Sequence, residues 1–171
     1  MPVNQMSMTS NMHEWNDFYV ATAGAAAALT GLIFVGISIN LTHILSFPLL
    51  VLKASVALIL LVSILIFSVL LLVPQESHNL ISYELIGFGL LVWVLVTRAD
   101  RKIYLKALNE FKRVYLFNLL FDQLAILPYV FAGFYLLFSH DTGFYWIVSA
   151  MILSFIKAVF DAWVLLIEIK R

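Results

Sequence analysis

The chain has 171 residues, of which 63% are hydrophobic and 12% are charged, with ten basic and ten acidic side chains. Soluble domains are about 45–50% apolar and about 25% charged, and a small domain buries only a modest share of its surface. The composition therefore excludes an ordinary soluble domain and predicts a protein embedded in lipid. The absence of cysteine excludes disulfides, iron–sulfur clusters, thiolate nucleophiles and cysteine-based zinc sites.

Long apolar stretches predict the membrane helices, because a spanning helix needs about 20 mostly apolar residues. The uncharged stretch 18–52 is too long for one helix. It is divided before Pro48, since proline is favoured in the first turn of a helix. The chain is expected to be a single all-α domain with five transmembrane helices, at about 13–45, 48–73, 80–97, 114–138 and 143–168.

The basic residues predict the orientation of these helices. With five helices, nine of the ten Lys and Arg residues fall on one side of the membrane. The positive-inside rule makes that side cytoplasmic, so the N-terminus is expected outside and the C-terminus inside. Leaving out the helix at 80–97 would scatter the basic residues to both sides, which favours its presence.

Most of these basic residues lie in segment 98–113, which either extends the adjacent helices beyond the bilayer or lies on its surface. A basic segment next to a membrane helix attracts anionic lipid. The residues expected to contact lipid headgroups at the cytoplasmic face are Arg98, Arg101, Lys102, Lys106, Lys112 and Arg113. Topology alone explains the charge, so no nucleic-acid partner is expected.

The first helix differs from the others in having small residues at a spacing of three and four. Small side chains let membrane helices approach closely. The stripe either packs inside one protomer, forms a contact between subunits, or lines a pore together with nearby polar groups. The candidates for packing or pore lining are Ala21, Gly24, Ala28, Gly31 and Ser38, with Thr30 and Asn40.

Charged residues within the last two helices form a second candidate site. Lys157 and Asp161 are four residues apart and so share a helix face, and Asp122 lies at a similar depth in the preceding helix. Asn118 and Gln123 are expected to add hydrogen-bonding groups to this charge cluster. Charges in a membrane are costly and so face protein or water. The cluster is interpreted either as an ion or proton pathway or as a structural lock between two helices.

The outer segments contain a third group, in which each histidine has an acid nearby. These residues are His13, Glu14, Glu76, His78, His140 and Asp141. Together they could gather a divalent cation or sense pH. Their spacing matches no zinc signature, so no metal is assigned and ordinary solvated loops remain the alternative. No hydrolase, nucleotide-binding or metalloprotease motif occurs, so the chain is expected to have no cofactor and no enzymatic activity.

Segment 23–41, AGAAAALTGLIFVGISINL, and the turn at Pro48 together resemble the opening of a widespread group of small bacterial multi-pass membrane proteins of uncharacterised function. The resemblance covers about a quarter of the chain. It implies a location in the bacterial inner membrane and carries over no catalytic residue.

Two alternative functions are favoured for this chain, ahead of a membrane enzyme. The first is a homo-oligomeric channel-like or transport-related protein, since five helices can scarcely enclose a pore in one protomer. The alternative is a non-conducting accessory or scaffold protein that binds another membrane protein or organises lipid.

Overall fold

The computed structural model describes residues 15–74, 78–107, 109, 112–138 and 143–169, and this part of the chain contains helices and no strand. Five of the helices are long and apolar enough to cross a membrane, which confirms the predicted multi-pass fold. These are α2 (Asn16–Ile39), α4 (Pro48–Leu72), α5 (His78–Lys106), α6 (Lys112–Phe138) and α7 (Gly143–Ile169), and the short α3 (Leu41–Ser46) follows α2.

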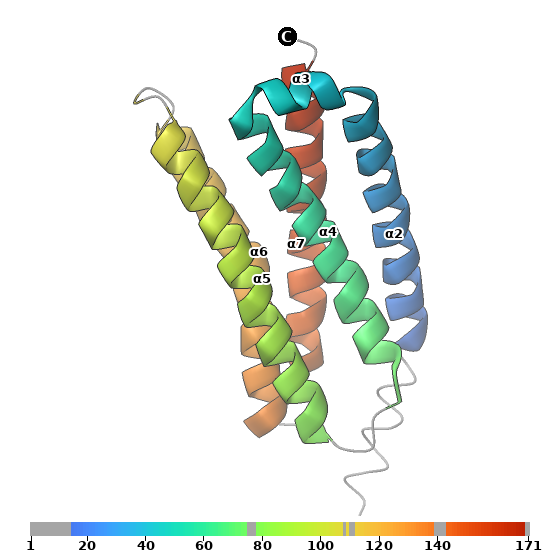
Figure 1. Ribbon diagram of the computed structural model, residues 1–171. Coiled ribbons are helices and arrows are strands. Elements are labelled where there is room, and N and C mark those ends of the chain that lie inside the picture. The colour runs from blue at the N-terminus through green and yellow to red at the C-terminus, as the bar shows by residue number, and fades with distance from the viewer. Residues whose placement is uncertain (1–14, 75–77, 108, 110–111, 139–142, 170–171) are drawn as a thin grey trace, which may run out of the picture.

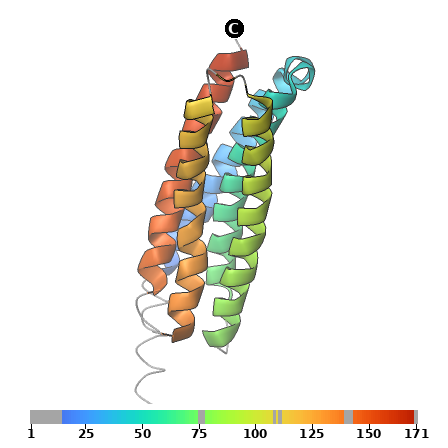
Figure 2. The ribbon, with the colours of Figure 1, turned by 90° about the vertical axis from the view of Figure 1, so that its left-hand side faces the viewer.

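The long helices run side by side as an elongated bundle (Figure 1). Helix α4 contacts α2, α5 and α7, so it lies at the centre of the arrangement. Helices α5 and α6 form a close pair, and α6 lies between α5 and α7 (Figure 2). Helix α3 crosses one end of the bundle, the end at which α7 also finishes (Figure 1). We call this end, which carries Lys53, Lys106 and Lys112 near the helix termini, the basic end.

Two helix boundaries differ from the sequence-based expectation. The first helix ends at Ile39 rather than near residue 45, because Asn40 leaves the helical conformation and its side-chain amide donates to the Gly36 carbonyl oxygen at 3.1 Å. Helix α5 continues to Lys106 instead of ending near residue 97, so the first half of basic segment 98–113 extends a membrane helix. The extended backbone of Phe47 separates α3 from α4, as expected for a residue that precedes proline.

Tight packing between helices occurs at glycines of α5 and α6 and not at those of α2. A Cβ atom added to Gly133 would lie 2.6 Å from Ile86 Cγ1 and 3.0 Å from the Ser82 carbonyl oxygen, so the two backbones approach closely there. A Cβ atom added to Gly24 or Gly31 would meet nothing within 4 Å. One interpretation of the small-residue stripe was packing within one protomer. For these two α2 glycines that interpretation is wrong.

This contrast predicts opposite effects of the same substitution in two helices. We expect Gly133→Ala to lower the thermal unfolding temperature in detergent, because overpacking typically costs about 1–3 kcal/mol. Gly31→Ala should leave the unfolding temperature of the monomeric chain unchanged or raise it, since alanine is favoured over glycine in helices by up to about 1 kcal/mol. Equal shifts of the same sign would contradict the packing described for Gly133.

Candidate functional site

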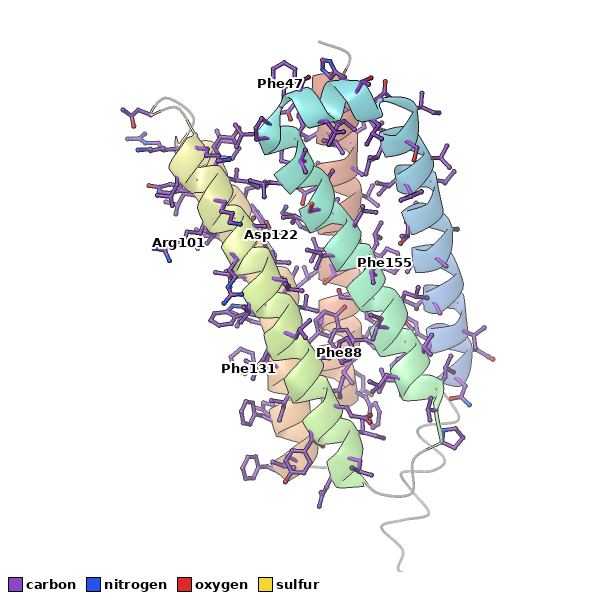
Figure 3. The ribbon with its side chains drawn as sticks, viewed as in Figure 1. Phe47, Phe88, Arg101, Asp122, Phe131 and Phe155 are labelled. Carbon is purple, nitrogen blue, oxygen red and sulfur yellow. The ribbon has the colours of Figure 1, made fainter. Side chains whose placement is uncertain are left out.

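The charged residues predicted in the last two helices meet inside the bundle. Lys157 Nζ of α7 lies 3.1 Å from Asp122 Oδ1 of α6 and 2.5 Å from Asp161 Oδ2 one turn along its own helix. Asp122 has no exposed surface and Lys157 is 7% exposed. Figure 3 places Asp122 between the α5–α6 pair and α4. A single lysine thus bridges two acids on neighbouring helices, as the sequence spacing indicates.

A third acid, Asp100 of α5, belongs to the same site and was not singled out from the sequence. It is 6% exposed and close enough to Lys157 and Asp161 to interact with them electrostatically. Its neighbours Arg98 and Arg101 are exposed, and Arg101 points away from the bundle (Figure 3). Treating segment 98–113 as one basic stretch hid this inward face. The available signal was the apolar period of three and four that continues into the segment, at Val92, Val96, Ala99 and Ile103.

An ion pair between α4 and α7 lies nearer the basic end. Lys53 Nζ is 2.6 Å and 2.8 Å from the two carboxylate oxygens of Glu168, and it also lies 5.3 Å from the centre of the Tyr115 ring. The sequence-based interpretation used Lys53 only as evidence of topology and did not consider Glu168. These residues are 115 positions apart, so their pairing requires the three-dimensional arrangement of α4 and α7.

These charged groups surround a cavity of about 710 Å³ bounded by α4, α5, α6 and α7. Its charged lining residues are Lys53, Asp100, Asp122, Lys157, Asp161 and Glu168. Apolar and aromatic side chains supply most of the remaining wall, including Tyr115, Phe121 and Phe160. The site is therefore an apolar cavity with a charged interior, within the range of about 300–1,000 Å³ typical of small-molecule sites.

The two polar residues predicted beside the cluster have different positions. Asn118 lines the cavity, and its amide lies within hydrogen-bonding reach of Asp161. Gln123 does not join the cluster: its Oε1 accepts from Trp93 Nε1 and its Nε2 donates to Thr97 Oγ1 at 3.1 Å. Gln123 follows Asp122 directly, and adjacent residues point about 100° apart on a helix. It therefore links α6 to α5 rather than α6 to α7.

Several carboxylate oxygens in the cavity are incompletely satisfied. Within the described part of the chain, both carboxylate oxygens of Asp122 and Oδ2 of Asp100 are buried without a hydrogen-bond partner. Lys157 lies within ion-pair distance of Asp122 Oδ1, but the angles do not make a hydrogen bond. Buried polar groups are normally hydrogen-bonded, so unpaired oxygens that line a cavity are places where a proton, water or ligand can bind.

The basic residues predicted to contact lipid lie at the basic end of the bundle, on the last turns of α5 and the first turn of α6. All are exposed except Lys112, which is partly buried and lies 5.9 Å from the centre of the Tyr104 ring. The exposed ones are Arg98, Arg101, Lys102, Lys106 and Arg113. They are accessible to headgroups, and the contact with anionic lipid stays a prediction.

The small-residue stripe of α2 lies on the outer face of that helix. Its exposed members are Ala21, Gly24, Ala28, Gly31 and Ser38. The polar groups proposed to line a pore are bonded to their own helix. Thr30 and Ser38 donate to the carbonyl oxygens four residues earlier at 2.7 Å and 2.8 Å, and Asn40 does the same. These side chains are thus compatible with lipid contact and do not require water. A contact with a second chain stays a prediction.

The outer histidine–acid group lies outside the described residues, except for the backbone of His78 at the start of α5. That these histidines and acids lie close together therefore stays a prediction. Among the residues that the structure describes, no three His, Cys, Asp or Glu side chains are grouped closely enough to hold a metal ion. The three aspartates around Lys157 thus form an ionic cluster and not a ready-made metal site.

Comparison with protein-family models, curated proteins and solved structures finds no match to this chain.

The ionic cluster predicts an asymmetric response to mutation. Lys157→Met should lower the thermal unfolding temperature strongly, because removing one partner of a buried pair costs about 3–5 kcal/mol. The triple variant Lys157→Met, Asp122→Asn, Asp161→Asn should be closer to the parent, since it leaves only Asp100 without a partner, whereas Lys157→Met leaves three acids unpaired. Lys102→Met, at an exposed position on α5, is the matched control and should have little effect. A triple variant less stable than Lys157→Met would show that the ion pairs themselves stabilise the fold.

Proposed function

We propose that this chain is a transport-related protein of the bacterial inner membrane, in which the acid-rich cavity exchanges protons for a cation. The observation that carries the proposal is the excess of acids over bases inside the bundle. Four carboxyl groups and two ammonium groups line the cavity, and Asp122 is fully buried with unpaired oxygens. Cation transport accounts for this excess more directly than an enzymatic role, for which the chain offers no catalytic motif.

The numbers of acidic and basic groups in the cavity indicate how protons and cations would be exchanged. Glu168 is paired with Lys53, and Lys157 is shared by Asp122 and Asp161. Asp100 and one of these two aspartates therefore have no base of their own. A bare carboxylate buried inside the bundle is costly, so we expect each excess acid to be protonated or neutralised by a cation. The two states are alternatives, and a cation that binds displaces a proton. Such a site performs exchange without a net change of charge.

The wider arrangement that we propose is a homo-oligomer with its basic end in the cytoplasm. The outward-facing small residues of α2 would allow a helix of a second copy to pack closely. The basic residues of α5 and α6 would lie at the cytoplasmic face, beside anionic lipid.

The alternative is a non-conducting accessory protein that binds another membrane protein or organises lipid. The exposed α2 stripe also favours this function, because it can accept a helix of a different protein. In that case the ionic cluster would serve only to join α6 to α7.

Exchange in reconstituted vesicles tests the proposal. Liposomes that contain the protein and a trapped pH indicator are prepared with an acidic interior, and potassium, sodium or ethidium is added outside. We expect at least one cation to make the interior more alkaline, as protons leave in exchange. Asp122→Asn should abolish the signal, whereas Asp17→Asn, which removes an exposed acid near the start of α2, should not. A tag after Arg171, tested for protease access in cells, reports the orientation.

Two outcomes would overturn the proposal. If no cation drives proton movement in vesicles that contain folded protein, the accessory function is favoured. The proposal also fails if exchange persists in a folded variant in which Asp122, Lys157 and Asp161 are replaced by Asn, Met and Asn. These three residues would then not be part of the exchange pathway.

A further inference from the structure

The size and lining of the cavity point to one class of ligand. We infer that the cavity binds an organic cation with an apolar body, such as a lipophilic ammonium or phosphonium ion, which reaches it from the membrane through an opening between α6 and α7. This inference rests on the proposed exchange function and names its substrate.

The volume of the cavity indicates that its ligand is larger than an inorganic ion. A water molecule occupies about 30 Å³ of liquid volume, and a dehydrated alkali cation is of similar or smaller size. The cavity measures about 710 Å³, so a single inorganic ion would leave most of it unfilled. The space is instead suited to a molecule with the dimensions of a small drug.

The position of the apolar lining residues gives the direction of access. Several apolar side chains of α6 and α7 that line the cavity are also exposed: Val114, Phe121, Leu124, Ile156, Phe160 and Val164. The cavity therefore opens between these two helices. The outer surface of a membrane helix faces hydrocarbon, so a ligand with an apolar body can enter there without crossing water.

The polar lining residues decide the charge of the ligand. Asp100, Asp122 and Asp161 come from three different helices, and only Asp122 and Asp161 are paired with the one lysine among them, Lys157. A positive group placed among them would neutralise an acid that has no base of its own. Tyr115, Phe121 and Phe160 add aromatic rings, which attract organic cations. A lipid acyl chain would fill the apolar part but leave the excess acid unpaired.

The two parts of the cavity therefore match the two parts of such a ligand. The cationic group would replace a proton on the carboxyl group, which leaves as H⁺, and the apolar body would contact the side chains between α6 and α7. Each bound monovalent cation would release one proton. The bond broken is the carboxyl O–H bond, and no other bond changes.

Binding of tetraphenylphosphonium to the purified protein in nanodiscs tests this inference. We expect saturable binding, accompanied by proton release into a weakly buffered solution. Asp122→Asn should weaken binding by more than about tenfold, as for the loss of a desolvated charge partner. The double variant Phe121→Ala, Phe160→Ala should weaken it as well. Phe117→Ala is the matched control, because Phe117 is an exposed residue of α6 that is absent from the cavity wall.

Competing ligands separate the possible occupants. Tetramethylammonium carries the charge without the apolar body, and neutral triphenylphosphine oxide has aromatic bulk without the charge. Both should bind more than about tenfold more weakly than tetraphenylphosphonium. Equal binding of triphenylphosphine oxide, or binding that Asp122→Asn leaves unchanged, would overturn the inference.

The failure of this inference can be distinguished from failure of the proposed function. If potassium or sodium drives proton exchange in vesicles while tetraphenylphosphonium shows no saturable binding, the exchange function stands and the organic ligand is wrong. If tetraphenylphosphonium binds with proton release but no cation is exchanged in vesicles, the ligand class stands and transport is wrong.

Discussion

The arrangement of this protein depends on the high free energy of an unpaired charge in hydrocarbon. Asp122 and Asp161 lie within spanning helices, and so their side chains face the bundle interior, where Asp100 joins them from α5 nearer the basic end. Lys157 lies within ion-pair distance of both Asp122 and Asp161, and its contact with Asp122 joins α6 to α7. Apolar side chains alone could fill the cavity, but they could not neutralise the remaining acids.

The rest of the bundle is held together by apolar packing around α4. Leu60, Ile64 and Phe67 of this helix are fully buried, and Phe67 stacks on Tyr129 of α6 with ring centres 4.2 Å apart. Away from the basic end, Gly133 brings α6 close to α5. This packing joins α4 to α5, α6 and α7, the helices that contribute the acids of the cavity.

The sequence predicted the parts of this structure that depend on local composition. The five spanning helices follow from apolar length, and the meeting of Asp122, Lys157 and Asp161 follows from helical spacing and the short connection between α6 and α7. Asp100 and the pair of Lys53 with Glu168 could not be found in the same way. Their partners lie on helices that are distant along the chain, and the surrounding basic residues concealed the inward face of α5. For the α2 glycines, the sequence predicted a packing contact within the protomer that the structure does not contain. A small-residue stripe does not reveal which side of a helix faces its neighbours.

The central claim is that the same buried carboxyl groups hold either a proton or a cation. Infrared difference spectroscopy of the protein in lipid tests it most directly, because a protonated carboxyl group has a carbonyl stretching band that is lost on deprotonation. We predict that adding tetraphenylphosphonium decreases this band in the parent protein and that the decrease is smaller in Asp122→Asn. An unchanged band in the parent at saturating cation would contradict the claim, since binding would then occur without displacement of a proton.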